Sequence, residues 1–411
     1  MVQPVTRCRI CGNDDLVEVL DLGEQALTGV FPARRDQKIT AGPLRLVKCS
    51  GGKDVCGLLQ LAHSYDLGEM YGDNYGYRSG LNASMVRHLA SKVEAIRALV
   101  PLSAGDVVVD IGSNDGTTLG CYPEAGLELV GIDPTAAKFR EFYKPHIRVI
   151  PDFFTADLFR QAMPGRKARV VTSFSMFYDL ERPLDFMREV ADILADDGVW
   201  VFEQSYMPLM IEMNSYDTAC HEHLEYYALK QIKWMTDRCG LKIVDVGFND
   251  VNGGSFSVAA AKIDSGLSEF KGLPSLLAKE VEQGLDTLEP YRAFARRTAD
   301  SRAELVAFVR KAVQEGKRVG ALGASTKGNV LLQFCAFTDA DLFAIGEVNA
   351  DKFGKFTPGT LIPIRPEGEV LASAPDYLII LPWHFRSTFI KKLAGGRSKI
   401  VFPLPKLEVV G

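Results

Sequence analysis

The sequence lacks any long apolar run, and no stretch reaches the ~18 consecutive apolar residues that a membrane-spanning helix requires. Its first residues, Met-Val-Gln-Pro-Val-Thr-Arg-Cys, contain no apolar core of a secretory signal. A basic excess is also missing, because 47 lysines and arginines face 52 aspartates and glutamates, for a net charge of -5. These absences argue against a membrane or a nucleic acid as a partner. We therefore expect a cytoplasmic protein.

Internal repeats with a period of about 20 to 50 residues are absent as well, and so is a low-complexity tail. With 411 residues, of which 47% are hydrophobic, the chain is long enough for two or three globular domains. In the cytoplasm, its eight cysteines are expected to be reduced or metal-bound rather than paired in disulfides.

Four of the cysteines form two pairs near the start of the chain. Cys8 and Cys11 have the two-residue spacing of a zinc knuckle, whereas six residues separate Cys49 from Cys56. Two glycines in the longer loop allow it to fold back. Four thiolates close a tetrahedral site and leave no position for substrate, so we predict a structural Zn2+. The alternative is four unrelated reduced cysteines.

An apolar run that ends in an acidic, glycine-rich turn organises the middle of the chain. Val107–Ile111 has the composition of a buried parallel strand, and Gly112 and Gly116 then let the backbone turn sharply. Asp110 and Asp115 flank this turn. Because carboxylates repel an anionic pyrophosphate, the turn favours a cationic, phosphate-free ligand.

A second strand is predicted over Leu127–Ile132, and it ends in Asp133, where an open α/β sheet places an acid on a ribose diol. A third strand is expected to end at Ile150, followed by Asp152 and Phe153. Together these features resemble motif I and the following acid of class I S-adenosylmethionine-dependent methyltransferases. The resemblance implies that Asp152 and Phe153 hold the adenine. The alternative is an ordinary strand, turn and helix.

The remaining pattern completes an open sheet. Further strands are expected at Ala168–Phe174, Val199–Glu203, Leu241–Val246 and Gly254–Ala261, with a helix over 184–195. Ser173 to Tyr178 follow the carboxyl end of a strand and are expected to face the ligand. Seven strands with a C-terminal hairpin match the methyltransferase sheet.

Residues 63–88 are rich in tyrosine and polar groups and have neither strand alternation nor a helical stripe. We expect an ordered loop that leads into a helix starting near Asn82. It is interpreted as a lid whose tyrosines and Arg78 reach over the ligands. The alternative is that these tyrosines cover a core edge.

An insertion between the fifth and sixth strands, Tyr216–Tyr227, carries His221, Glu222 and His223. The spacing differs from that of a zinc hydrolase, which needs two histidines on one helical face. A histidine beside a carboxylate suits proton transfer, because imidazole titrates near neutral pH and the carboxylate can fix its tautomer. The alternative is a solvated polar loop.

The C-terminal third follows a charged helical stretch, about 263–315. It begins with another strand, which leads into a second glycine-rich turn. Here Ser325, Thr326 and Lys327 replace the acids, and these groups suit a diphosphate. Residues 355–360 are either part of the ligand site or a simple turn at a Pro-Gly pair. His384 is either a substrate contact or a residue at a helix N-terminus.

These motifs, in this order along essentially the whole chain, resemble those of the three-domain sugar C-methyltransferases, which methylate a nucleotide-linked ketosugar on carbon in branched-chain deoxysugar biosynthesis. The motifs are the four cysteines, Tyr-Gly-Tyr-Arg-Ser, Asp-Ile-Gly-Ser-Asn-Asp-Gly, Glu-His, Gly-Ala-Ser-Thr-Lys-Gly-Asn and Lys-Phe-Thr-Pro-Gly-Thr. The resemblance implies an α/β protein with a zinc-binding domain (1–72), a methyltransferase domain (73–262) and a Rossmann-like nucleotide-sugar-binding domain (263–411).

The resemblance also implies how the site works. His223 matches the base that removes a proton next to the ketone, and Glu222 is the acid beside it. Tyr77 or Tyr75 is the loop tyrosine near the sugar, and we favour Tyr77. This chain departs from some members with Cys220 in place of a tyrosine and Tyr178 in place of a histidine. Both departures affect the expected sugar pocket more than the proton transfer.

The expected site residues fall into groups by ligand. The catalytic group is His223, Glu222, Tyr77, Tyr75 and Tyr178. The S-adenosylmethionine group is Tyr71, Asp110, Gly112, Asn114, Asp115, Asp133, Pro134, Asp152, Phe153, Ser173 and Ser175. The sugar-nucleotide group is Arg78, Cys220, His221, Ser325, Thr326, Lys327, Asn329, Lys355, Thr357 and His384. Methylation of oxygen or nitrogen on a small molecule and binding without catalysis are the alternatives. The oligomeric state stays open, a monomer included.

Overall fold

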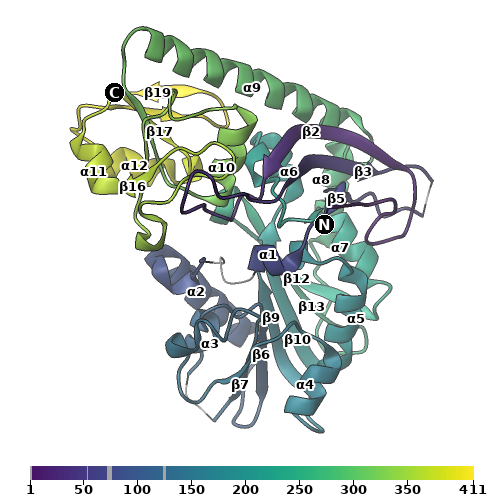
Figure 1. Cartoon of the computed structure of the whole chain (residues 1–411). Helices are drawn as coiled ribbons and strands as arrows, with labels where there is room; N and C mark the ends of the chain where they lie inside the picture. Colours follow the sequence, from purple (N-terminus) through teal and green to yellow (C-terminus); the bar gives the residue numbers. More distant parts are fainter. Residues whose placement is uncertain (1, 53, 72–75, 124–125) are drawn as a thin grey trace.

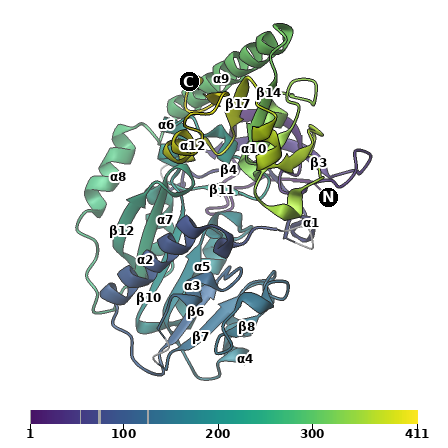
Figure 2. The ribbon, with the colours of Figure 1, turned by 90° about the vertical axis from the view of Figure 1, so that its left-hand side faces the viewer.

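A computed structural model describes residues 2–52, 54–71, 76–123 and 126–411. Within them, the strands form sheets of seven, six and four strands and a two-stranded ribbon of β1 (Gln3–Pro4) and β5 (His63–Ser64). Figures 1 and 2 show the N-terminal and C-terminal parts side by side at one end of the central sheet. The predicted α/β class is confirmed.

The central sheet has the strand order β12-β13-β10-β9-β6-β7-β8 in the described residues, with an antiparallel hairpin at one edge. Its strands are β6 (Val107–Ile111), β7 (Glu128–Ile132), β8 (Arg148–Ile150), β9 (Ala168–Phe174), β10 (Leu194–Ser205), β12 (Leu241–Asn249) and β13 (Ser255–Lys262). All five residues of β6 are buried, as a parallel strand covered on both faces requires. The seven strands and the hairpin therefore agree with the sequence prediction, although β10 begins earlier than expected.

Helices cover this sheet. They are α2 (Ala83–Leu99), α3 (Thr117–Gly120), α4 (Ala156–Ala162), α5 (Pro183–Ile193), α6 (Met207–Glu212) and α7 (Leu229–Thr236). The side chain of Asn82 accepts a hydrogen bond from Ser84 N at the start of α2. An asparagine cap of this kind satisfies a free backbone donor of the first turn. The predicted helix start near Asn82 is confirmed.

The N-terminal sheet takes one of its strands from far along the chain. Its order is β11-β4-β3-β2, and the strands are β2 (Leu16–Ala26), β3 (Ala41–Cys49), β4 (Leu59–Leu61) and β11 (Glu225–Tyr226). β11 belongs to the insertion that follows β10. The short helix α1 (Leu67–Tyr71) follows β5 along the chain.

The C-terminal sheet has the order β16-β15-β14-β17-β18-β19 and is parallel except for β19. Its strands are β14 (Val319–Leu322), β15 (Ile345–Glu347), β16 (Ile364–Pro366), β17 (Tyr377–Ile380), β18 (Lys399–Phe402) and β19 (Glu408–Val410). Its helices are α10 (Thr326–Phe334), α11 (Glu367–Ala372) and α12 (Arg386–Lys392). From the sequence, one strand is expected before the glycine-rich turn, and three more at Phe343–Val348, 377–383 and Ile400–Leu404. These four correspond to β14, β15, β17 and β18, whereas β16 and β19 were missed.

Two helices, α8 (Leu273–Glu282) and α9 (Glu289–Gln314), form the charged connection between the central and C-terminal sheets. Figure 1 shows α9 running along the top of the molecule, from the purple N-terminal strands to the C-terminal sheet. None of the helices described has both the length and the apolar character that a bilayer crossing demands.

An aromatic cluster attaches the insertion to the central sheet. The ring of Phe177, which follows β9, stacks on Tyr227 at 5.3 Å and meets Trp200 of β10 at 5.4 Å. All three side chains are fully buried. Each aromatic pair contributes about 0.5–1.5 kcal/mol beyond the area that it buries. The insertion is therefore part of the core and not a loose loop.

Candidate functional site

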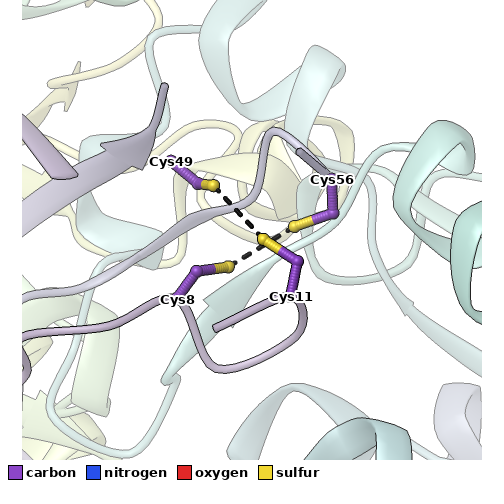
Figure 3. Close-up of side chains that lie close together, drawn as sticks. All are labelled: Cys8, Cys11, Cys49 and Cys56. Carbon is purple, nitrogen blue, oxygen red and sulfur yellow. Dashed lines mark hydrogen bonds between the residues drawn. The ribbon is translucent and has the colours of Figure 1, made fainter. Parts of the chain in front are cut away.

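The four N-terminal cysteines converge on one point, as Figure 3 shows. Their Sγ atoms all lie within 4.8 Å of one another, with Cys8 and Cys56 at 3.4 Å and Cys11 and Cys49 at 3.6 Å. Sulfur atoms at about 2.3 Å from one tetrahedral zinc ion would be about 3.8 Å apart. Gly51 has a φ of 97°, which lets the longer loop fold back as expected. The geometry fits a zinc ion.

Two neighbouring side chains support this cluster. Asn13 Nδ2 donates a hydrogen bond to Cys49 Sγ at 3.3 Å. The buried Lys48 Nζ donates to Gly57 O at 2.7 Å, and burial lowers the pKa of this ammonium. Four protein ligands leave no open coordination position, so the ion stabilises the fold and takes no part in a reaction.

The turn after β6 depends on glycine at two positions. Gly112 and Gly116 have φ angles of 73° and 75°. A Cβ on Gly112 would lie 2.9 Å from Met176 Cγ, and one on Gly116 would lie 2.6 Å from the ring of Tyr143. Because only glycine combines a positive φ with such close approach, a side chain at either position would distort the turn.

Acidic side chains surround this turn. Asp110 is buried and accepts a hydrogen bond from Thr172 Oγ1 at 2.6 Å, and burial raises its pKa to about 7. Asp133, at the end of β7, accepts from Asn114 N at 2.9 Å and Thr135 N at 2.6 Å. Within the described residues, neither acid forms a salt bridge, so the site suits a cationic ligand such as a sulfonium.

The segment before α2 lies against the same turn. Asn114 accepts a hydrogen bond from Ser79 N at 3.0 Å and donates one to Tyr77 O at 3.0 Å. Asp115 Oδ2 accepts from Gly80 N at 2.9 Å, and Arg78 Nε lies 3.6 Å from the same oxygen. The predicted lid residues thus reach the turn through their backbone and Arg78.

The side chains of the lid tyrosines are placed differently. Tyr77 is 51% exposed, and the guanidinium of Arg78 lies 3.4 Å from the centre of the Phe142 ring. Tyr75 and the side chain of Tyr71, which were also predicted to contact the ligands, lie outside the part of the chain that the structure describes.

The other expected cofactor residues are distributed around the carboxyl ends of the strands. Asp152 and Phe153 follow β8 and are exposed, while Pro134 is half-buried behind Asp133. Ser175 is exposed after β9, and its N–H donates to Glu203 O at 2.7 Å.

Ser173 has a different environment. It is buried, and its Oγ accepts a hydrogen bond from the indole Nε1 of Trp200 at 2.9 Å. Its hydroxyl is engaged within the core, because β9 alternates its side chains between the two faces of the sheet.

His223 has the environment of a neutral base. Its Nδ1 lies 2.9 Å from Thr218 O, and because a carbonyl only accepts hydrogen bonds, Nδ1 carries the proton and Nε2 the lone pair. Its ring packs on Tyr178 with the centroids 4.2 Å apart. Burial and then the charge of Lys327 lower the pKa of His223 to about 4. The expectation that a neighbouring carboxylate fixes the tautomer was wrong, because the Thr218 carbonyl does so.

The carboxylate of Glu222 has partners of its own. Its Oε2 accepts a hydrogen bond from Thr28 Oγ1 at 3.3 Å. Burial raises the pKa of Glu222, and the neighbouring thiol of Cys220 and hydroxyl of Thr28 oppose that rise. Cys220 lies beside this carboxylate and is fully buried. It therefore lines the site on the side that faces the protein interior.

His221 lies in the N-terminal core. It is fully buried, and its ring meets Tyr65 edge to face with the centroids 4.6 Å apart. Burial lowers its pKa to about 4. The two histidines of the insertion therefore occupy different environments, although one residue separates them in the sequence.

The turn after β14 has polar groups in place of acids. Ser325 caps α10 by accepting from Gly328 N at 3.1 Å, and Thr326 is the first residue of that helix. Lys327 Nζ donates to Asn252 O at 2.6 Å, and burial lowers the pKa of this ammonium. Asn329 is buried and donates to Thr28 O at 2.7 Å, so its amide joins the N-terminal and C-terminal parts.

The other expected sugar-nucleotide residues have separate environments. Thr357 is buried, and its Oγ1 lies 2.6 Å from Thr360 Oγ1 and accepts from Ile362 N at 2.9 Å. Its hydroxyl thus closes the Pro-Gly turn, while Lys355 is half-buried beside it. His384 is half-buried, and burial followed by the Lys327 charge lowers its pKa to about 3.

Sequence reasoning missed several residues of this centre. Asp217 is fully buried and accepts from Trp383 Nε1 at 2.8 Å, which joins the insertion to the C-terminal sheet. The sequence could have indicated Asp217, because it is an acid in the same insertion as His223. Thr28 and Thr218 act through one hydroxyl and one backbone carbonyl, and no sequence pattern marks such contacts.

Known protein families match three successive parts of the chain. Residues 8–71 match a zinc binding domain, residues 83–246 a methyltransferase domain, and residues 250–405 the C-methyltransferase C-terminal domain. The C-methyltransferase NovU of Streptomyces niveus is 30% identical over 416 residues, which cover 100% of this chain and 98% of that protein.

Solved structures match a smaller part of the chain. The CcbJ methyltransferase from Streptomyces caelestis has a TM-score of 0.35 and 14% identity, and the match covers 48% of this chain and 96% of that one. For the mitomycin 7-O-methyltransferase MmcR, the TM-score is 0.35 and the identity 14%, with coverages of 44% and 55%.

The fold and the matched domains define an S-adenosylmethionine-dependent C-methyltransferase, an enzyme with a zinc-binding N-terminal domain. The chain belongs to the three-domain C-methyltransferase family, of which NovU is a relative over the full length. S-adenosylmethionine is its methyl donor, and zinc is its structural metal.

Proposed function

We propose that the protein methylates a carbon next to the ketone of a nucleotide-linked ketodeoxysugar, through a base-generated enolate, in branched-chain sugar biosynthesis. The observation that supports this proposal is the neutral His223, whose Nε2 has a free lone pair beside Tyr178 and within the field of Lys327. A carbon acid needs such a base, whereas most hydroxyl and amine nucleophiles already carry a lone pair.

The reaction can be written with these side chains. His223 Nε2 takes the proton next to the ketone, and the electrons of the C–H bond form the enolate. The enolate carbon would be the nucleophile for the methyl group, and the S–CH3 electron pair would stay with the sulfur. S-adenosylmethionine supplies an electrophilic methyl group.

The nucleotide half of the substrate is assigned to the turn after β14. The N-terminus of α10, the hydroxyls of Ser325 and Thr326 and the ammonium of Lys327 provide donors for a diphosphate. In this assignment the three domains span 1–72, 73–262 and 263–411. The proposal includes a cytoplasmic location, with neither nucleic acid nor membrane as a partner.

Proton exchange tests the proposal. The purified enzyme is incubated in D2O with a panel of nucleotide-linked 4-ketosugars and S-adenosylhomocysteine, and the sugar is followed by NMR. Enzyme-dependent loss of the proton next to the ketone is expected for the true substrate. If no sugar exchanges while S-adenosylmethionine still binds, the proposal is wrong, and methylation of oxygen or nitrogen takes its place.

A further inference from the structure

The loop that carries Glu222 and His223 is anchored in the N-terminal sheet. Directly after this pair, β11 adds antiparallel to β4, with Glu225 opposite Gln60 and Tyr226 opposite Leu59. The backbone N–H of Leu61 also donates to Leu224 O at 2.8 Å. The catalytic loop thus ends as a strand of the zinc-binding domain's sheet.

A second segment of that domain reaches the carboxylate itself. Thr28 is fully buried and donates its hydroxyl to Glu222 Oε2 at 3.3 Å. The next residue, Gly29, lies so close that an added Cβ would be 2.6 Å from Glu222 Oε1. The carboxylate therefore packs between the Thr28 hydroxyl and the backbone of Gly29, which has no side chain.

The segment that contains Thr28 and Gly29 is fixed on the C-terminal domain. Thr28 O accepts from the buried Asn329 Nδ2 at 2.7 Å. Two residues earlier, Ala26 N donates to Gln333 Oε1 at 2.8 Å, and Ala26 O accepts from Gln333 Nε2 at 3.1 Å. Three hydrogen bonds to α10 thus hold the segment in place. The position of this segment is therefore set by α10, the helix whose N-terminus is assigned to the nucleotide.

We propose that Thr28 and Gly29 are positioning residues for the Glu222 carboxylate, so that the zinc-binding domain completes the catalytic centre. This inference rests on the proposed function, with Glu222 as the acid beside the base His223, as the sequence resemblance implies. Without Thr28 and Gly29, the half-buried carboxylate would rotate toward other partners or shift from its place. Because a misplacement of about 1 Å can cost about 10²-fold in rate, this position affects turnover.

Three substitutions in the zinc-loaded, full-length enzyme test the role. Thr28→Val keeps the shape and removes the hydroxyl, and we expect kcat to fall about 10-fold with little change in KM. Thr28→Ser keeps the hydroxyl and is expected to restore kcat to within about twofold of wild type. Gly29→Ala places a Cβ against Oε1, and its kcat is expected to fall about 10²-fold.

Controls separate positioning from folding. Zinc content, S-adenosylmethionine affinity and thermal unfolding of Thr28→Val should equal those of wild type. Thr40→Val changes an exposed threonine of the same domain and should leave all rates unchanged. If Thr28→Val and Thr28→Ser have wild-type kcat, or if both are equally slow, the positioning role is overturned.

A double-mutant cycle tests whether Thr28 acts through Glu222. In a Glu222→Gln background, Thr28→Val should have little further effect, because the carboxylate that it positions is gone. An undiminished effect in that background overturns the inference. If wild type exchanges no sugar proton, the proposed function fails. If it exchanges and Thr28→Val keeps the wild-type rate, only the positioning role fails.

An infrared measurement needs no substrate. Difference spectra against Glu222→Gln isolate the carboxyl signal of Glu222. Removing the Thr28 hydroxyl takes away a hydrogen bond that favours the charged form, so the protonated fraction of Glu222 should rise in Thr28→Val at a given pH. An unchanged signal overturns the inference.

Discussion

Two glycine-rich turns occupy the same topological place in two different sheets, one after β6 and one after β14. Each follows the carboxyl end of a parallel strand and leads into a helix, α3 or α10. Their chemistry is opposite, because Asp110, Asp115 and Asp133 surround the first, whereas Ser325 and Lys327 belong to the second. Topology therefore places a ligand, and the charge of the turn selects which ligand it is.

The two turns also differ in what holds them. The first is closed by contacts within its own domain, since Asp133 accepts from Asn114 N and Asp115 from Gly80 N. The second is held by other parts of the chain, because Lys327 donates to Asn252 O and Asn329 to Thr28 O. His223 packs on Tyr178, which follows β9 of the central sheet, and Lys327 after the second turn helps to lower the pKa of His223.

The largest effect is expected for His223→Ala. If the two turns bind the ligands and His223 removes the proton, this substitution should lower the rates of methyl transfer and proton exchange by about 10²-fold or more. That factor is the usual contribution of a general base. Affinity for S-adenosylmethionine, measured by calorimetry, should stay nearly unchanged. His221→Gln is the matched control and should keep catalysis. A His223→Ala rate above about a tenth of wild type excludes His223 as the base.

Asp133→Ala sharpens the contrast between the turns. Removing this acid takes away the acceptor of Asn114 N and Thr135 N and a carboxylate at the end of β7. We expect the Kd for S-adenosylmethionine to rise about 10-fold or more, because hydrogen bonds to charged groups contribute about 1.5–3 kcal/mol. The Kd for the nucleotide-sugar should not change. A matching loss for both ligands would contradict separate roles for the turns.

Lys327→Met tests the second turn through pH. Burial and the Lys327 cation lower the pKa of His223 to about 4, so the base is neutral above that pH. Without the cation the pKa should rise toward the ordinary 6.5. The acidic limb of the kcat/KM profile should therefore move to higher pH, and activity near pH 5 should fall most. Lys327→Arg keeps the charge and should keep the limb in place. An unmoved limb in Lys327→Met would show that the cation does not act on His223.

Gly116→Ala has the smallest expected effect on chemistry and addresses the shape of the first turn. A positive φ of 75° and a Cβ 2.6 Å from the Tyr143 ring should cost about 1–3 kcal/mol of unfolding free energy. Gly120→Ala, at the end of the same helix α3, meets nothing closer than 3.8 Å and should be nearly neutral. Urea denaturation distinguishes the two, and equal stabilities would contradict the steric account.

Much of the central sheet could be predicted because its signals are local. The apolar run Val107–Ile111, the glycines of the turn and the Asn82 cap each act within a few residues. The zinc cluster was likewise predicted from the spacing of its cysteines, although the loop between Cys49 and Cys56 is longer than usual. Short strands such as β16 and β19 have too few residues for a pattern, and they were missed.

The arrangement of the catalytic centre required the tertiary structure. By itself the sequence determined the zinc ligands, the two turns and the presence of Glu222 and His223 in one insertion. The Thr218 carbonyl fixes the His223 tautomer from only five residues away, through the folded shape of the insertion. Packing between distant segments decided that β11 joins the N-terminal sheet and that Thr28 meets Glu222. The reason is physical: periodicity and spacing report neighbours along the chain, whereas these contacts arise where segments up to 194 residues apart are buried together.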